Sequence, residues 1–97
     1  MPLAIRIHPQ DNVAVVLEPI RAGDLVHVAP GTKRTTLCSA AAIGFGHKVA
    51  LRDIPSGHPV IKFGQRIGRS TADMRCGDHV HIEKLSGFPS GETAATP

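Results

Sequence analysis

Three side chains near the C-terminal end combine metal-binding chemistry with the spacing of a β-strand. His79, His81 and Glu83 alternate with Val80 and Ile82. Residues two apart in a strand share a face, so the imidazoles and the carboxylate project together while the apolar pair faces the core. Such nitrogen and oxygen ligands suit a divalent metal ion. Three side chains in one straight row rarely all reach one ion. The metal interpretation therefore uses two of them plus ligands from elsewhere, and a solvated strand face is the alternative.

A second cluster is Gly46-His47-Lys48, at the start of an alternating run. Histidine transfers protons near neutral pH and lysine pairs with carboxylates, so His47 and Lys48 are candidate catalytic residues. Lys62 follows the apolar pair Val60-Ile61, an arrangement that suits a lysine facing a groove. Ordinary exposed side chains are the alternative for all three residues.

The elements that must position these residues are short strands joined by frequent turns. Apolar alternation and apolar runs predict strands at residues 3–8, 13–17, 25–28, 47–52, 59–63 and 79–85. Three consecutive alanines predict one or two helical turns within residues 37–44. A seven-residue pattern also recurs, beginning at Ile20, Ile54 and Met74. It consists of an apolar residue, two residues of any kind, Gly, a polar residue, a residue of any kind and Val. It predicts three turns with glycine at positive φ, each starting a strand. The predicted fold class is all-β with one or two short helical turns.

Strand alternation also predicts which of these side chains face solvent. The outward set is His47, Lys48, His79 and His81, and the inward set is Val49, Leu51, Val80 and Ile82. The outward polar residues are not needed for a core, so they indicate a functional face meant for a larger partner.

Size and composition limit the remaining possibilities. The 97 residues suffice for one domain, predicted at residues 1–85, and the small polar residues 86–97 indicate a tail or linker. Eleven basic residues are scattered among eight acidic ones, with three Phe and no Trp or Tyr, which argues against nucleic-acid binding. No apolar run approaches the roughly 20 residues of a membrane span, and the N-terminus has no signal-peptide pattern, so a cytoplasmic protein is expected. Cys38 and Cys76 lack metal-site spacing and are expected to be free thiols.

Taken in order, four motifs resemble the N-terminal domain of the altronate dehydratase family, which includes galactarate dehydratases and sulfolactate sulfo-lyases. They are His8-Pro9-Gln10-Asp11-Asn12-Val13-Ala14-Val15, Gly46-His47-Lys48-Val49-Ala50-Leu51-Arg52-Asp53-Ile54, Ile61-Lys62-Phe63-Gly64-Gln65-Arg66-Ile67-Gly68 and Gly77-Asp78-His79-Val80-His81. The resemblance covers residues 5 to about 85 and implies an SAF domain with a β-clip fold. Two positions differ from the family's pattern, because Phe63 stands in place of Tyr and Glu83-Lys84 in place of His-Asn.

The resemblance implies a metal-dependent lyase that removes water from a sugar acid to give a 2-keto-3-deoxy product. Most of the site would lie in a large catalytic subunit or domain, and this chain would supply one wall as a small subunit or N-terminal domain. His47 and Lys48 would then be catalytic, and Lys62 and Arg52 would bind the substrate. The implied metal ligands are His79, His81 and Glu83.

The implied cofactor is a divalent metal ion, Fe²⁺ or Mn²⁺, whose site the partner would complete. The alternative function is a stand-alone SAF module that binds a ligand or a protein without catalysis. The Gly-His-Lys and His-x-His motifs favour the lyase, because a β-clip fold does not demand them and a non-catalytic module has little use for them.

Overall fold

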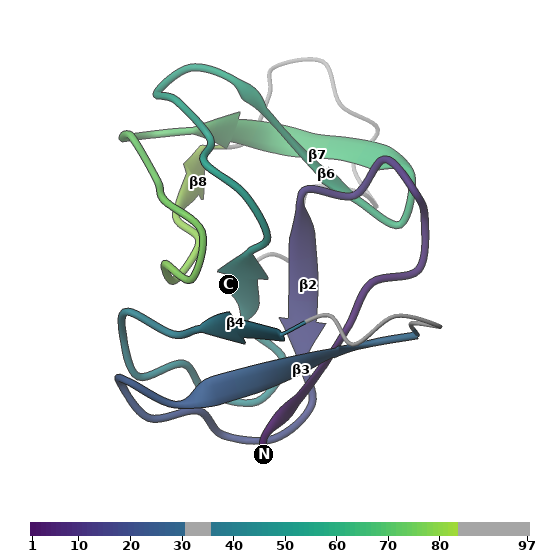
Figure 1. Ribbon diagram of the computed structural model, residues 1–97. Coiled ribbons are helices and arrows are strands. Elements are labelled where there is room, and N and C mark those ends of the chain that lie inside the picture. The colour runs from purple at the N-terminus through teal and green to yellow at the C-terminus, as the bar shows by residue number, and fades with distance from the viewer. Residues whose placement is uncertain (31–35, 84–97) are drawn as a thin grey trace.

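The regular structure of the chain consists of short β-strands, seen in a computed structural model that describes residues 1–30 and 36–83 (Figure 1). The strands are β1 (Leu3–Ile5), β2 (Val13–Val16), β3 (Leu25–Ala29), β4 (Thr36–Cys38), β5 (Lys48–Ala50), β6 (Pro59–Lys62), β7 (Gln65–Ser70) and β8 (Ile82–Glu83). One sheet has the order β4-β3-β1-β2-β5, and the other has the order β6-β7-β8. All neighbouring strands are antiparallel except β1 and β3, which are parallel. The prediction of an all-β fold is confirmed.

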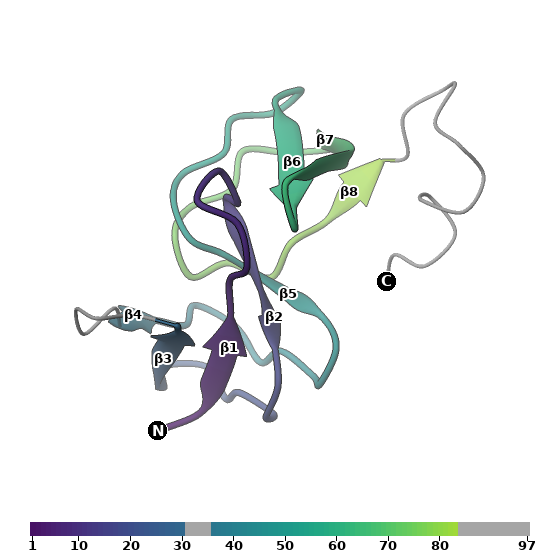
Figure 2. The same cartoon turned by 90° about the vertical axis from the view of Figure 1, so that its right-hand side faces the viewer.

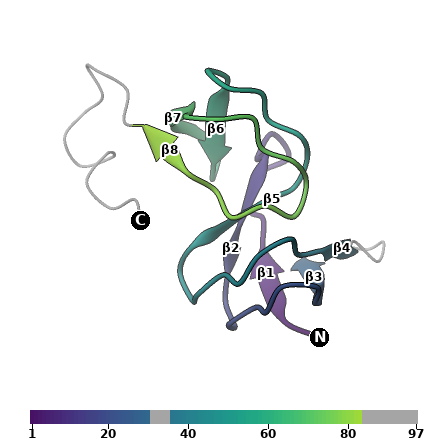
Figure 3. The ribbon, with the colours of Figure 1, turned by 90° about the vertical axis from the view of Figure 1, so that its left-hand side faces the viewer.

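The two sheets lie one above the other, and β2 and β5 of the larger sheet extend toward the smaller one (Figures 2 and 3). This arrangement gives two hydrophobic clusters instead of one core. Cluster 1 consists of Ala4, Ala14, Val16, Ile20, Val26, Val28, Leu37, Ile43 and Val49. Cluster 2 consists of Val13, Ala50, Ile54, Val60, Ile67, Met74 and Val80. Because β2 and β5 each contribute to both clusters, these strands are covered on both faces.

Four turns of the same geometry connect the strands. In each turn the N–H of the residue after a glycine donates to the carbonyl two residues before that glycine, over 2.9–3.1 Å. The glycine has a positive φ, as the third position of a type II turn requires. The four are Gly23 (87°), Gly46 (84°), Gly57 (83°) and Gly77 (95°). The sequence pattern predicted three of these turns. The fourth, in residues 43–49, fits the same pattern, was not predicted, and contains His47 and Lys48.

The four turns belong to two structurally repeated halves. Ile20 pairs with Ile43 through two backbone hydrogen bonds of 2.9 Å, and Ile54 pairs with Met74 through two of 2.8 Å. The Gly46 N–H donates to Val16 and the Gly77 N–H donates to Ala50, again at the same distance of 2.8 Å. The turns and paired residues of the segment from Val16 to Val49 therefore match those of the segment from Ala50 to Val80, which is three residues shorter between its two turns.

The predicted helical turns within residues 37–44 are wrong, since no residue in the described ranges is helical. Thr36–Cys38 forms β4, and the Ser39 hydroxyl then donates to the carbonyl of Ala41 over 2.6 Å. The backbone N–H and carbonyl groups of Ile43 form hydrogen bonds with those of Ile20. Alanine propensity alone cannot offset the cost of nucleating one isolated helical turn, so pairing across the fold decides the conformation.

Two strand predictions also differ from the structure. A strand over residues 79–85 is wrong at its start, because His79 forms only an isolated bridge with Val49 and β8 begins at Ile82. The six-residue β7 was not predicted, since Ile67 is its one large apolar residue and no apolar alternation marks the strand. Residues 84–97, which include the predicted tail, lie outside the described residues.

In the part of the chain that the structure describes, no helix is long and apolar enough to cross a membrane. Cys38 and Cys76 are exposed free thiols.

Candidate functional site

Three histidines from two distant segments gather beside β5. The Nδ1 atom of His47 lies 3.1 Å from the Nε2 atom of His79. The ring centroids of His79 and His81 are 4.6 Å apart, edge to face. The antiparallel bridge between Val49 and His79 brings the two segments into register. The structure thus brings together three of the residues that the sequence singled out.

The contact between His47 and His79 requires that one nitrogen donates a proton and the other accepts it. Burial lowers the pKa of His79, and the neighbouring charges of His81, His47 and Lys48 lower it further. His79 is therefore largely neutral at pH 7. A neutral imidazole in such a pair accepts or passes on a proton without first losing one to solvent.

Lys48 is buried, with 1% of its surface exposed, which corrects the prediction that it faces outward. The strand β5 lies between the two hydrophobic clusters. Val49 packs in cluster 1 on one face and Ala50 packs in cluster 2 on the other, so neither face is open to water. Burial lowers the pKa of Lys48 to about 8, helped by the charge of Lys62. A lysine with this pKa is partly neutral near physiological pH and can act as a base. Leu51, predicted to be in the core, is only half-buried against cluster 1.

Lys62 lies at the end of β6, before a tight hairpin turn to β7. The turn residues Phe63 and Gly64 both have left-handed backbones, with φ of 55° and 78°. This is the conformation of a type I′ hairpin, which suits the twist of the flanking strands but disfavours a residue such as phenylalanine. The Nζ atom of Lys62 lies 5.1 Å from the centroid of the Phe63 ring, within cation–π range. Since the charge of Lys62 acts on the buried Lys48, both amines belong to one electrostatic site.

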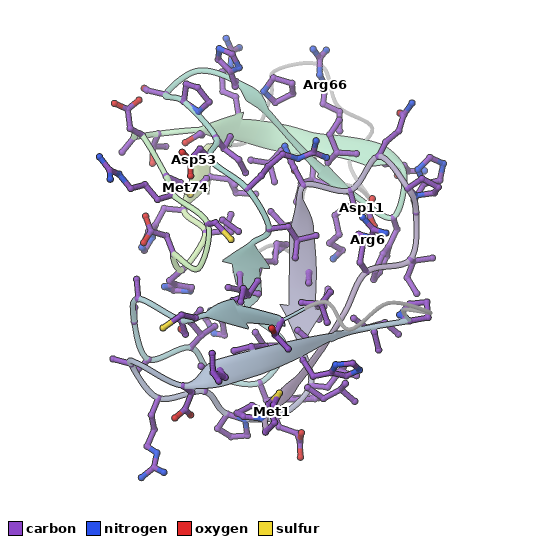
Figure 4. All side chains as sticks on the ribbon, viewed as in Figure 1. Met1, Arg6, Asp11, Asp53, Arg66 and Met74 are labelled. Carbon is purple, nitrogen blue, oxygen red and sulfur yellow. The ribbon has the colours of Figure 1, made fainter. Side chains whose placement is uncertain are left out.

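Asp11, to which no sequence-based prediction gave a role, holds this hairpin in place. Its carboxylate is 1% exposed and accepts hydrogen bonds from the backbone N–H groups of Ile7, His8 and Gly64, at 3.3, 3.0 and 2.8 Å. Burial acts to raise the pKa of Asp11, but these bonds, with one from Phe63, hold it below its ordinary value. Figure 4 shows Asp11 at the turn end of the β6–β7 hairpin. The available signal was an acidic residue two positions before a fully apolar strand.

Asn12 adds a second connection between the same segments. Its side chain donates to the carbonyl of Pro59 over 2.9 Å and accepts from the N–H of Ile61 over 2.8 Å. Asp11 and Asn12 together fix β6, and therefore Lys62, relative to the start of β2.

Arg52 does not join the histidines. Its guanidinium donates to the carbonyl of Asp11 over 3.3 Å and lines an open groove of about 480 Å³ with Asn12, His58 and Ile61. The lining of this groove includes neither Lys48 nor Lys62. The predicted substrate-binding pair Lys62 and Arg52 is therefore divided between two places.

The residues fit part of a metal site and not a whole one. Within residues 1–30 and 36–83, no group of three or more His, Cys, Asp or Glu side chains is arranged to hold a metal ion. Glu83 lies in β8, and its side chain is outside the described part. The 3.1 Å between His47 Nδ1 and His79 Nε2 also suits two ligands of one ion, because nitrogens about 2.1 Å from a metal lie roughly 3.0–3.4 Å apart.

The site as a whole is basic. Five basic side chains from three segments contribute to it, namely His47, Lys48, Lys62, His79 and His81. Their mutual repulsion contributes to the lowered pKa values of Lys48 and His79. An anion bound among them relieves this repulsion, so the arrangement favours an anionic ligand.

Comparison with known proteins identifies the family of the chain. Residues 2–87 match the altronate/galactarate dehydratase SAF domain. The chain is 43% identical over 77 residues to altronate dehydratase of Escherichia coli (strain K12), and 36% identical over 78 residues to altronate dehydratase of Bacillus subtilis (strain 168). These matches cover 79% and 80% of this chain and 15% of each relative, so the chain spans only a small part of their length.

A shorter relative is matched over most of its length. The chain is 34% identical over 83 residues to (2R)-sulfolactate sulfo-lyase subunit alpha of Chromohalobacter salexigens, which covers 81% of this chain and 88% of the relative. The family match and these identities together show that the chain belongs to the SAF domain family of the altronate and galactarate dehydratases.

Proposed function

We propose that the chain supplies one wall of the active site of a sugar-acid lyase, as the small subunit or N-terminal domain of an altronate dehydratase-like hydro-lyase. The observation that carries the proposal is the hydrogen-bonded pair His47 and His79 beside the buried Lys48. The β-clip turns need none of these side chains, because the equivalent turns form with other residues at the same positions.

Elimination of water from a sugar acid requires loss of a proton next to the carboxylate and departure of a hydroxyl group. His47, whose Nδ1 is engaged with His79, is the proton acceptor in this proposal, and the imidazolium that results returns the proton to the departing hydroxyl, which leaves as water. The ammonium form of Lys48 stabilises the negative charge that develops as the proton leaves. Lys62 faces the same site from the hairpin turn and binds the carboxylate of the substrate. Arg52 has no role in this arrangement, because it lines the separate groove.

The expected divalent ion, Fe²⁺ or Mn²⁺, would be held by His79, with His81 and Glu83 as further candidates. Such an ion supplies Lewis-acid stabilisation of the charge on the substrate oxygen. Because the described residues offer only part of a ligand set, we propose that the large partner completes it.

The partner is part of the proposal for reasons of size. The chain spans 15% of the altronate dehydratases it matches and nearly all of a protein named as one subunit of a lyase. The site is not enclosed, since His81 is exposed and His47 and His79 are half-buried, so a second surface is needed to exclude water from the reacting atoms.

A reconstitution assay tests the proposal. The chain is mixed with the large portion of the enzyme from the same source, with Mn²⁺ or Fe²⁺, and supplied with altronate, galactarate or (2R)-sulfolactate. We expect product from one of these acids in the mixture and none from the isolated chain. His47→Gln should lower kcat at least 100-fold, consistent with the usual contribution of a general base.

His58→Gln is the matched control, because His58 follows the positive-φ Gly57 as His47 follows Gly46 but lies in the separate groove. It should retain full turnover. A mixture that forms a stable complex but converts none of the three acids would favour a binding module without catalysis. Equal loss of turnover in both variants would remove His47 from the mechanism.

A further inference from the structure

The turn that precedes His47 carries an exposed aromatic side chain. Phe45 is 70% exposed and lies between Gly44 and Gly46. An apolar ring left in water forgoes the stabilisation that burial gives to such a side chain. The ring is the most exposed large apolar side chain in residues 2–30 and 36–82.

The repeated turns provide an internal control for this position. Ala22, Ser56 and Cys76 occupy the same place in the other three turns, which have the same hydrogen bond and the same positive φ at the next residue. A small side chain therefore suffices for the turn. The phenyl ring of Phe45 is not explained by folding.

A second apolar side chain lies beside this turn. The Gly46 N–H donates to Val16 over 2.8 Å, so the turn lies next to the end of β2, where Leu17 is 38% exposed. In the other half the equivalent leucine is Leu51, which is packed against cluster 1. The chain therefore covers the apolar residue in one half of the repeat and leaves Leu17 and Phe45 open in the other.

We propose that Leu17 and Phe45, here called the Phe45 surface, dock onto the large portion of the lyase, with the phenyl ring seated in an apolar pocket of that partner. The inference rests on the proposed function. His47 is the last residue of the same turn, so any partner that closes the site over His47 must also cover Phe45. The family includes an altronate dehydratase in which this region is 15% of one chain and a sulfo-lyase in which it is nearly a whole subunit. A separate subunit must hold its partner without a covalent link, and buried aromatic side chains dominate such contacts.

Isothermal titration calorimetry tests the Phe45 surface directly. The chain is titrated into the separately produced large portion from the same source, without substrate, so the result does not depend on turnover. Phe45→Ala and Phe45→Ser should each raise Kd by roughly 10–100-fold, the range of a central interface residue. Phe45→Ser copies Ser56 of the equivalent turn, so this variant should retain the fold. Thermal melts check that it does.

Leu25→Ala is the control, because Leu25 is a 56% exposed apolar residue of β3, away from this turn. It should leave Kd within about 2-fold, as expected for a residue outside an interface. An unchanged Kd for Phe45→Ala, or no binding by the native chain, overturns the inference. If the isolated chain self-associates and Phe45→Ala abolishes this self-association, the surface binds a second copy of the chain, which also overturns the inference. A third outcome separates the two proposals. If Phe45→Ala weakens the complex but the native complex converts no sugar acid, the docking surface is supported and the proposed lyase function is refuted.

Discussion

Lys48 shows how a single residue links burial to function. A buried amine is destabilising while it is charged and harmless once it is neutral. The pKa of Lys48 is about 8 in the folded chain and near 10.5 in the unfolded one. Between these values the unfolded chain binds more protons than the folded chain, so the free energy of unfolding must rise with pH.

We therefore expect chemical denaturation with EDTA present to show stability increasing between pH 8 and 10.5, by up to about 3 kcal/mol. Lys48→Met, which has a similar length and no charge, should lose most of this rise. Lys62→Met removes a half-buried lysine from the same site and should keep it. A native profile that is flat over this range would show that Lys48 is not desolvated.

At the same scale, the sequence was sufficient to find His47, Lys48, His79 and His81, because their motifs are local. It was not sufficient to place Lys48 inside. A prediction from the alternation of apolar residues assumes that each strand has one buried and one solvent-exposed face, whereas β5 has a hydrophobic cluster on each side. Asp11 was missed for the opposite reason, since its three backbone partners include Gly64, which is 53 residues away.

At the scale of elements, the β6–β7 hairpin depends on Asp11. Phe63 has a left-handed backbone that costs a non-glycine residue on the order of 1 kcal/mol, and the carboxylate of Asp11 offsets this by accepting the N–H groups of the turn. A Cβ atom at Gly64 would lie 2.8 Å from the ring of His8, so the loop before β2 also packs tightly against the turn. The position of Lys62 is therefore fixed by residues more than 50 positions earlier in the chain.

Asp11→Ala should lower the free energy of unfolding by about 2–4 kcal/mol, because several buried N–H groups lose a charged acceptor. Asp24→Ala is the control, since Asp24 accepts one N–H, from Arg21 over 2.9 Å, and its loss should cost about 1 kcal/mol or less. The lowered pKa of Asp11 means that its contribution is present above pH 3.8 and is lost as pH falls through the folded value. Urea denaturation at pH 7 and pH 3 measures both effects. Similar losses for the two variants would show that Asp11 does not hold the hairpin.

Strand positions were largely predictable at this scale, because β1, β2, β5 and β6 fall within predicted ranges and β3 exceeds its range by Ala29 alone. The exceptions are informative. Residues 37–44 have helical composition, but the pairing of Ile43 with Ile20 overrides it. The pattern that predicted three turns also describes the fourth, which supports interpreting the chain as two repeated halves.

At the scale of the whole molecule, the repeat explains why one surface carries the chemistry. The two halves share their turns and their paired apolar residues but differ in side chains at equivalent places. Lys48 in the first half corresponds to His79 in the second, and His47 corresponds to Asp78. The bridge between Val49 and His79 then brings the end of the second half beside the start of β5. A small all-β chain thus gathers basic groups from both halves without enclosing them.

An open half-site has a measurable consequence for metal binding. The isolated chain offers His79 with His81 beside it, and no described group of three, so it should bind Mn²⁺ weakly. Joined to the large portion, it should bind at least an order of magnitude more tightly, because further ligands complete the coordination sphere. His79→Ala should remove binding by the isolated chain, while His58→Ala, which alters the separate groove, should leave it unchanged. Binding should weaken below about pH 6, as protons compete for the imidazole nitrogens. Calorimetry at pH 7.5 and pH 5.5 measures each case. Equal affinity of the isolated chain and the complex for Mn²⁺ would show that the partner contributes no ligand. Equal heats of Mn²⁺ binding for the native chain and His79→Ala would show that the histidines do not bind the metal and act in proton transfer alone.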